Sequence, residues 1–525
     1  MKKQILLSAM LSFAAFNMYA TDFTVTTSSG DPAVEGSFPN IMSSESLSDG
    51  DVINFDFDGE QIEEFTKITV KKSVTINGLN KKNNKKVIFT GVNQTLMVQS
   101  AVEINDCVFT GKNTSSLYAT TGATMLVDRC EFIDNDNYSI KDGEKKPSAG
   151  GAINVANSAK CIIKNSLFKD NKSAGGAIVI TVGGDVTLEN SSFIHNYASA
   201  SGGAIYMYTT ADKAIPSLSA TNCTFVNNYA SERGGAIYAW SRTGESFGMK
   251  LVNCTITSNY SGRNVGGGVA IFCNANMTAE LTMANCIVAG NTGGSLDDNF
   301  FSPNDLGCWK GPRDKDKDGN LYVRNYTFNT TNCIYGVAES MDADDQAGTP
   351  MNDVFSGNSI KVDDFANSKI FTSLYKLDNT IFPDIEGDEV WSPTLTADGM
   401  PVALLCEGSI AIAKGTASYN GVTIPTTDQL GKARPATPAI GAVEYGGESG
   451  IVNNIAGASD IKIWNDGNVL YAAGIESMAS IAVYDMTGKQ VYEGTIREGV
   501  SVTVPVLEGL YIAKVNGATA KLIIK

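Results

Sequence analysis

Aromatic side chains recur at a fixed interval in the middle of the chain. Tyr208, Trp240 and Phe272 are separated by two equal steps of 32 residues. Because alternate residues of a strand take opposite faces, Tyr206 shares a face with Tyr208, and Tyr238 shares one with Trp240. Stacked rings stabilise one another by about 0.5–1.5 kcal/mol per pair, which would explain a purely structural strip. An exposed strip is equally a platform for sugar rings or a protein partner.

A second group of candidate residues is an acidic segment with alternating oxygen ligands. The candidate calcium ligands are Asp314, Asp316, Asp318 and Asn320. Alternate oxygen ligands and a glycine, here Gly319, form the first half of calcium loops. The glutamate expected at the twelfth position is replaced by Asn325. A calcium site and an acidic solvated loop therefore both remain open.

Catalytic groups are sparse in this sequence. His195 is the only histidine, and as a general base it would need an orienting partner that the sequence does not reveal. Asp297 and Asp298 form an acidic pair, but the surrounding motifs of polygalacturonases are missing. Phosphate loops, zinc spacings, catalytic triad motifs and basic patches do not stand out. A net charge of −16 also argues against a nucleic-acid partner.

These residues are embedded in an internal repeat, which predicts the architecture. Gly-Gly pairs begin at Gly202, Gly234 and Gly266, again 32 residues apart, and an Asn-Cys-x-Phe or Asn-Cys-x-Ile phrase recurs with nearly the same period. In the phrase around Asn253, apolar residues on both sides can face inward only if the chain turns a corner there. Asparagine tolerates the left-handed backbone of such a corner. Glycine pairs and β-branched runs oppose helical repeats, so the period predicts a right-handed parallel β-helix with stacked asparagines.

Most of the ten cysteines follow the same repeat. Six share one register, with Ser166 and Ser191 taking the equivalent place in other coils: Cys107, Cys130, Cys223, Cys254, Cys286 and Cys333. Neighbouring coils lie about 4.8 Å apart, within reach of a disulfide, but in-register side chains point the same way. We therefore expect a ladder of buried thiols. Three others lie outside the register and are the better candidates for disulfides: Cys273, Cys308 and Cys406.

Two segments of the repeat region resemble known families. The Gly-Gly-Ala-Ile and Phe-x-x-Asn units between about residues 100 and 295 resemble the repeats of chlamydial polymorphic outer-membrane proteins, which are shared by many bacterial surface β-helices. The segment 411–415, with Asp428, Arg434 and residues 438–445, resembles the closing region of choice-of-anchor Q β-helix proteins. Both families are defined by scaffold and surface location, so neither resemblance implies a catalytic residue.

The two ends of the chain point to export. Lys2 and Lys3 precede an apolar run from Ile5 to Phe16 and a small residue, Ala20, where cleavage could fall, as in a secretory signal peptide. The last 65 or so residues alternate in the manner of an antiparallel sandwich and resemble the C-terminal sorting domain of type IX secretion (Por system) cargo. The residues of this sorting motif are Tyr484, Asp485, Gly488, Gly509, Tyr511 and Lys525. The resemblance implies passage through the periplasm to the cell surface or the medium.

The expected organisation is a signal peptide at 1–20, a β-rich cap with the first coils at 21–100, a β-helix with its closing region at 101–446 and a sorting domain at 451–525. The fold class is therefore all-β: a right-handed parallel β-helix followed by a small antiparallel β-sandwich, without a transmembrane helix. The expected function is an exported adhesin or scaffold that binds glycans or surface proteins. Two alternatives remain: a polysaccharide lyase or glycoside hydrolase of the pectate-lyase-like class, and a structural surface component.

Overall fold

A computed structural model describes residues 20–446 and 462–524 except for short gaps. The gaps are residues 94, 142, 149, 210–213, 242–246, 264, 274–276, 296–299, 310–323, 342–348, 352, 378–390, 398, 420, 467–468, 474–478, 486–488, 498–501, 507–508 and 516–517. The chain divides into two compact units, Met1–Ser449 and Gly450–Lys525. The expected signal peptide lies outside the described residues except for Ala20. Within the described part, no helix has the length and apolarity to cross a membrane.

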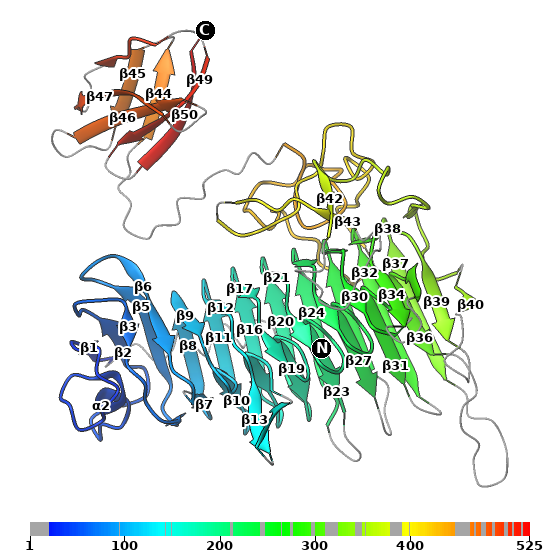
Figure 1. Cartoon of the computed structure of the whole chain (residues 1–525), viewed down its shortest axis with the longest axis horizontal. Helices are drawn as coiled ribbons and strands as arrows, with labels where there is room; N and C mark the ends of the chain where they lie inside the picture. Colours follow the sequence, from blue (N-terminus) through cyan, green and yellow to red (C-terminus); the bar gives the residue numbers. More distant parts are fainter. Residues whose placement is uncertain are drawn as a thin grey trace. The chain divides into compact units, whose positions relative to one another are not determined.

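The first unit is a stack of coils built from parallel strands (Figure 1). Sheet A consists of β1 (Asp22–Val25), β2 (Val52–Phe55), β5 (Val74–Asn80), β8 (Ala101–Asn105), β11 (Thr124–Asp128), β16 (Lys160–Lys164), β20 (Asp185–Glu189), β24 (Ser217–Thr221), β28 (Phe247–Val252), β32 (Thr278–Ala284) and β37 (Asn325–Thr331). Sheet B consists of β3 (Gln61–Ile62), β6 (Lys85–Thr90), β9 (Cys107–Thr110), β12 (Glu131–Ile133), β17 (Leu167–Lys169), β21 (Ser192–Ile194), β25 (Thr224–Val226), β29 (Thr255–Thr257), β33 (Ile287–Val288), β38 (Ile334–Tyr335) and β41 (Ile360–Lys361).

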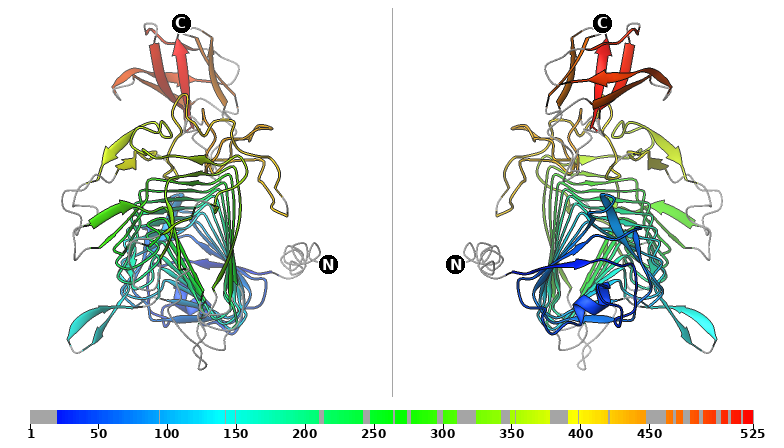
Figure 2. Two further views of the ribbon diagram at one scale, coloured as in Figure 1. Left: turned by 90° about the vertical axis from the view of Figure 1, so that its right-hand side faces the viewer. Right: turned by 90° about the vertical axis from the view of Figure 1, so that its left-hand side faces the viewer.

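Two further sheets complete each coil. Sheet C consists of β4 (Ile68–Val70), β7 (Leu96–Val98), β10 (Leu117–Ala119), β15 (Ile153–Val155), β19 (Ile178–Thr181), β23 (Ile205–Tyr208), β27 (Ile237–Ser241), β31 (Val269–Cys273), β36 (Leu306–Trp309), β39 (Ala338–Met341) and β40 (Thr349–Pro350). The shorter sheet D consists of β18 (Lys172–Ser173), β22 (Tyr197–Ala198), β26 (Tyr229–Ala230), β30 (Tyr260–Ser261), β34 (Thr292–Ser295) and β35 (Phe300–Pro303). A complete coil therefore runs through A, B, D and C, and Figure 2 shows the coils superimposed along the axis of the stack.

The corner between sheets A and B is made by one residue in the left-handed conformation. Asn165, Asn190, Asn222 and Asn253 have φ of 46°, 49°, 51° and 49°. Their side chains also form an outer ladder, in which Asn222 donates to Asn190 at 3.1 Å and Asn253 donates to Asn222 at 3.2 Å. Asparagine suits this position because its short amide tolerates positive φ and bonds to the coil above. The predicted asparagine corner is therefore present in successive coils.

The Gly-Gly pairs form the turn into sheet C. Gly234 has φ of 64°, and a Cβ at this position would lie 2.4 Å from the Ile237 carbonyl oxygen. A side chain there would therefore collide with backbone. The repeat conserves glycine at this place in the sequence because the coil has no room for anything larger.

The interior is filled by columns of identical side chains. Six phenylalanine rings, one per coil, stack with centroids 4.6–5.2 Å apart: Phe89, Phe109, Phe132, Phe168, Phe193 and Phe225. The six ladder cysteines are likewise buried, and all ten cysteines are free thiols. The expected thiol ladder is therefore present, whereas the disulfides expected from Cys273, Cys308 and Cys406 are not.

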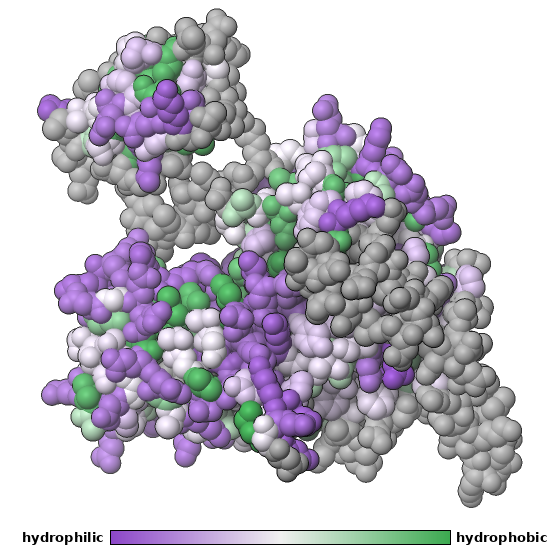
Figure 3. All heavy atoms as spheres, viewed as in Figure 1, coloured by the Kyte–Doolittle hydropathy of each residue, from purple (hydrophilic) through white to green (hydrophobic). Residues whose placement is uncertain are grey.

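The ends and one edge of the stack carry additions. Helix α2 (Phe38–Met42) lies at the first coils, where Phe38 packs on Phe55 and Phe89. An antiparallel hairpin of β13 (Tyr138–Lys141) and β14 (Glu144–Pro147) projects from the stack (Figure 2). On the face drawn in Figure 3, the coloured hydrophobic residues form small groups separated by hydrophilic ones.

The segment 391–446 covers part of sheet B, and we call it the covering segment. Gln429 bonds to the hydroxyls of Thr224 at 2.6 Å and Ser192 at 2.8 Å. The Thr416 and Asn285 groups exchange two hydrogen bonds of 2.8 Å. The outer positions of β25 and β29 are consequently buried, whereas those of β17, beyond the covering segment, are open. The covering segment begins with β43 (Trp391–Pro393), which pairs antiparallel with β42 (Leu374–Lys376).

The C-terminal unit contains two antiparallel sheets. One consists of β44 (Lys462–Asp466), β45 (Val469–Ala473) and β48 (Val502–Thr503). The other consists of β46 (Ala479–Asp485), β47 (Gln490–Ile496), β49 (Gly509–Val515) and β50 (Ala518–Ile524). Leu470 of the first sheet and Ile481 of the second belong to the same buried core. The unit thus has a core of its own.

Candidate functional site

An inner asparagine ladder leads to the candidate site. Its members are fully or almost fully buried, and each side-chain amide donates to the next at 2.8–2.9 Å: Asn135, Asn171, Asn196, Asn228, Asn259 and Asn291. The last amide, Asn291 Nδ2, donates to Asp305 Oδ1 at 2.8 Å. An ionised carboxylate only accepts hydrogen bonds, so Asp305 ends a chain of amides whose donors all point toward it.

Asp305 is held by backbone as well as by the ladder. Oδ1 also accepts from the Asn291 amide nitrogen at 2.8 Å, and Oδ2 accepts from the Val337 amide nitrogen at 2.8 Å. Its side chain is 1% exposed. Burial raises the pKa of Asp305 to about 6, against the lowering effect of these hydrogen bonds. Both oxygens are thus occupied within the fold, which makes Asp305 a structural group with a titration near physiological pH.

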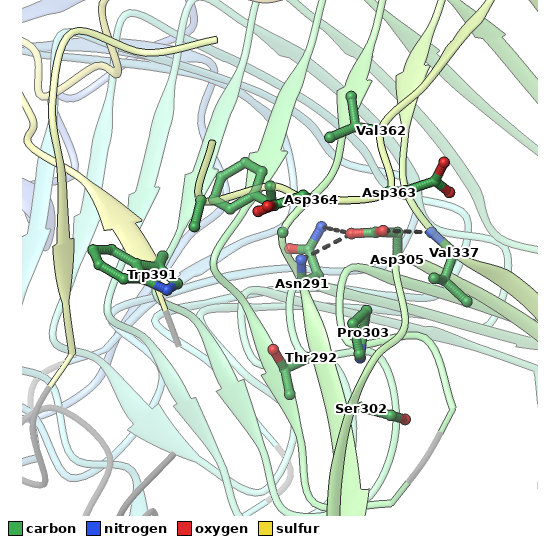
Figure 4. A pocket seen from close by; sticks show the side chains of 14 residues that line it. Asn291, Thr292, Ser302, Pro303, Asp305, Val337, Val362, Asp363, Asp364 and Trp391 are labelled. Atoms are coloured by element: carbon green, nitrogen blue, oxygen red, sulfur yellow. Dashed lines mark hydrogen bonds between the residues drawn. The ribbon is translucent and has the colours of Figure 1, made fainter. Parts of the chain in front are cut away.

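A pocket of about 490 Å³ opens beside Asp305, and we call it the Trp391 pocket. Its walls come from the end of the stack, with Thr292 and Ser302, and from the segment around Asp364 and Phe365. In Figure 4, Trp391 lies to the left of the pocket and Asp305 to the right. The lining thus combines aromatic rings, hydroxyls and carboxylates, which is the composition expected of a small-ligand site.

The aromatic strip predicted from the sequence lies on the outer face of sheet C. Strand register places Tyr208 beside Trp240 and Trp240 beside Phe272. Trp309 extends this column by one coil, with its ring centroid 6.1 Å from that of Phe272. We call these four residues the aromatic column. Tyr238 lies next to it, with its centroid 5.6 Å from that of Phe272.

The strip is less exposed than expected. Tyr238 is 5% exposed and Phe272 is 4% exposed, while Tyr206, Tyr208 and Trp240 are half-buried. The expectation of an open strip is therefore wrong for Tyr238 and Phe272. The rings pack against one another and against neighbouring side chains, because outward residues of adjacent coils are only about 4.8 Å apart. The half-buried rings of Tyr206, Tyr208 and Trp240 are therefore the part of the strip that a ligand can reach.

Two arginines lie against the aromatic column. The Arg233 guanidinium carbon is 5.8 Å from the Phe272 ring centroid, and that of Arg324 is 4.7 Å from the Trp309 centroid. Arg233 also pairs with Glu232 at 3.3 Å. Both contacts have the geometry of cation–π pairs. The column therefore joins aromatic surface to positive charge.

His195 has the orienting partner that the sequence could not reveal. Its Nδ1 lies 2.5 Å from Asp170 Oδ1, and Lys169 lies 3.8 Å from the other oxygen of the same carboxylate. His195 and Asp170 occupy the same corner of adjacent coils, with φ of 55° and 57°. The side chains are about one-third exposed. The stacking of adjacent corners is enough to bring His195 and Asp170 together. Neither residue is among those that line the Trp391 pocket.

The remaining predicted sites are only partly described. Asp314, Asp316, Asp318 and Asn320 lie outside the described residues, as do Asp297 and Asp298. Among the residues that the structure does describe, no three acidic, histidine or cysteine side chains are grouped for metal binding. In the tail, Tyr484 and Asp485 end β46, and Gly509 and Tyr511 lie in β49, directly beside it. Gly488 and Lys525 fall outside the described residues.

Three residues of these sites escaped the sequence analysis. Trp309 follows Phe272 by 37 residues (309 − 272), so the regular 32-residue step misses it. Asp305 follows its ladder neighbour Asn291 by only 14 residues, and a return of the chain through β35 carries it there. Trp391 reaches the pocket from outside the repeats altogether. The one available signal was the Leu306–Trp309 phrase, which keeps the alternation of a sheet C strand without its glycine pair.

Comparison with known proteins agrees with the architecture. Residues 58–254 match the family described as "Right handed beta helix region". No match is found among curated proteins. The family match and the stacked parallel strands together identify the first unit as an all-β, right-handed parallel β-helix.

Proposed function

We propose that this protein is exported to the cell surface and binds glycan chains along sheet C of its β-helix. The observation that carries the proposal is the aromatic column, in which the half-buried rings of Tyr208, Trp240 and Trp309 lie in successive coils around the buried Phe272. Aromatic rings bind the apolar faces of sugars, and a row of them suits a linear chain better than a single small ligand.

The arginines narrow the class of glycan. Arg233 brings a partly exposed guanidinium group to the rings, and Arg324, which is buried and donates to the Cys273 carbonyl at 3.2 Å, adds a second positive charge. Guanidinium groups pair with carboxylates in a planar, two-pronged geometry. A chain of uronic acids would offer both the ring faces and the carboxylates. Such a chain also has to approach a protein of net charge −16, so its binding should weaken if either arginine is removed.

Binding to uronic-acid polymers tests this proposal directly. We expect Trp240→Ala to weaken binding about tenfold, since stacking on one ring contributes about 0.5–1.5 kcal/mol beyond the area that it buries and a tenfold change in affinity corresponds to about 1.4 kcal/mol. Tyr118→Ala is the matched control, because Tyr118 is a half-buried residue of the same sheet, in an earlier coil. Equal binding by wild type and Trp240→Ala would refute the role of the column.

The same mixtures separate binding from catalysis. If the protein were a lyase, unsaturated product would accumulate with time and absorb in the ultraviolet. We expect stable binding without product. Steady product formation would replace the scaffold proposal with the enzymatic one.

Export rests on the two ends of the chain. The apolar segment after Lys3 supports entry into the periplasm, and the resemblance of the tail to type IX sorting domains supports passage across the outer membrane. The separate core of the C-terminal unit is consistent with a tail that can be removed after transport. We expect deletion of residues 451–525 to retain the protein in the periplasm, as measured by cell fractionation and surface labelling. Normal surface display of the shortened chain would contradict the sorting role.

A further inference from the structure

The Trp391 pocket has a chemistry different from that of the aromatic column. Three carboxylates line it, on Asp305, Asp363 and Asp364, and none of the described residues of the lining is a lysine, arginine or histidine. Asp305 is committed to the Asn291 and Val337 donors. Asp363 and Asp364 line the pocket with exposed side chains, and we call these two groups the mouth carboxylates. The available charge of the pocket is therefore negative and lies at its opening.

Each of the two mouth carboxylates has a partner in this chain, and both partners, Asn367 and Lys361, are exposed. Hydrogen bonds from Asn367 lower the pKa of Asp364, so it carries its charge throughout the neutral range. Asp363 pairs with Lys361 at 2.8 Å, and these side chains are 82% and 55% exposed. Such exposed pairs contribute little and exchange partners readily. Asp363 can thus turn toward a cationic ligand at small cost. Asp364 keeps its two hydrogen bonds from Asn367 and can accept from a ligand with its remaining lone pairs.

Aromatic rings form the opposing wall. Phe365 packs closely on Gly290, where a Cβ would lie 2.5 Å from its ring, so that ring is held in place. The Trp391 indole already attracts an ammonium group of this chain, Lys376 Nζ, 5.5 Å from its ring centroid. Indole is the strongest of the natural cation–π acceptors. The wall therefore favours a ligand that is both flat enough to pack on a ring and positively charged.

We propose that the Trp391 pocket binds a compact ligand that carries a primary ammonium group on a six-membered ring, with the ring against Trp391 and the ammonium facing Asp363 and Asp364. The volume of about 490 Å³ accommodates one such ring with room for substituents. An amino sugar and a simple cyclic amine share this chemistry. The pocket uses none of the residues of the aromatic column, so the proposal stands or falls separately from glycan binding on sheet C.

Two pairs of probes test the proposal on the full chain by calorimetry or ligand-observed NMR. Cyclohexylamine is matched by cyclohexanol, and glucosamine, measured below pH 7, is matched by glucose. We expect the charged member of each pair to bind about tenfold more tightly than the neutral member, which corresponds to one cation–π contact and one carboxylate contact. Tighter binding of glucosamine than of cyclohexylamine assigns the site to amino sugars, and the reverse order assigns it to simple amines.

Variants locate the site. Asp364→Asn and Asp363→Asn change exposed side chains and leave the fold intact, and we expect each to weaken the binding of the amines several-fold without affecting cyclohexanol. Trp391→Ala should weaken both members of each pair, and Trp240→Ala, in the aromatic column, should change neither. Equal binding of charged and neutral probes, unchanged amine binding in Asp364→Asn, or no binding of either amine at millimolar concentration would overturn the proposal.

Discussion

The side-chain amide of Asn291 donates to the buried carboxylate of Asp305 at 2.8 Å, so the inner asparagine ladder ends on a titratable group. The ladder amides are aligned, and each donates in the direction of Asp305. Because burial raises the pKa of Asp305 to about 6, the end of the ladder changes its protonation state near that pH.

The first prediction concerns the pH dependence of stability. Above its unfolded pKa of about 3.9, the buried carboxylate binds a proton more tightly in the folded state than in the unfolded state. The contribution of Asp305 to the free energy of unfolding is therefore greatest below pH 4 and is lost as the pH rises through about 6. We expect Asp305 to make the free energy of unfolding about 2 kcal/mol smaller at pH 6.5 than at pH 4.5.

Asp305→Asn provides the comparison for this effect. Asparagine still accepts from Asn291 but presents one amide donor where Val337 needs an acceptor, so the variant should be less stable in acid. The difference between wild type and variant, measured by denaturant unfolding at the two pH values, should shrink by about 2 kcal/mol as the pH rises. A pH-independent difference would show that Asp305 has the same pKa in both states.

The second prediction concerns the corner residue Asn253. Alanine at φ of 49° strains the backbone by about 1–2 kcal/mol, and it also loses the amide bonds to Asn222 and Asn285. We expect Asn253→Ala to lower the free energy of unfolding by about 2–4 kcal/mol. Asn253→Gly loses the same side-chain bonds without the strain, so it should be about 1–2 kcal/mol more stable than the alanine variant. Equal stability of the two variants would mean that the corner relaxes.

The third prediction concerns the covering segment. Arg434 and Glu444 form a buried ion pair at 2.6 Å, with side chains 2% and 7% exposed. Removing one partner of such a pair costs about 3–5 kcal/mol, so Arg434→Met should release this segment locally. Hydrogen exchange should then rise in residues 401–445 and stay low in β32. Lys432→Met, which removes an exposed charge from the same segment, should change neither region.

The fourth prediction concerns the thiols. Burial raises the pKa values of Cys107, Cys223 and Cys286, and a buried thiol is unreactive because the thiolate is the nucleophile. We expect a thiol reagent to find ten groups per chain under denaturing, non-reducing conditions, and at most the half-buried Cys406 in the native protein. Fewer than ten groups after denaturation would reveal disulfides.

The sequence by itself determined the coil. Its signals are local and repeated. Each corner requires a residue that tolerates left-handed backbone, and each turn into sheet C requires residues without a side chain. The parallel register then places equivalent positions of adjacent coils side by side. This is why the neighbourhood of Tyr208, Trp240 and Phe272 followed from spacing alone. Each such contact recurs with the period of the repeat, so a single sequence suffices to read it.

Only the tertiary structure decided which parts of the coil are covered and where a pocket forms. Gln429 bonds to Ser192, 237 residues away, and Trp391 lines the same pocket as Thr292 although it belongs to a segment without repeats. Such contacts occur once, between surfaces that have no common period, and they depend on how a long connection folds back over the stack. The burial of Phe272 depends on Trp309, which follows it outside the regular step, and the raised pKa of Asp305 depends on the return of the chain that places this carboxylate at the end of the ladder.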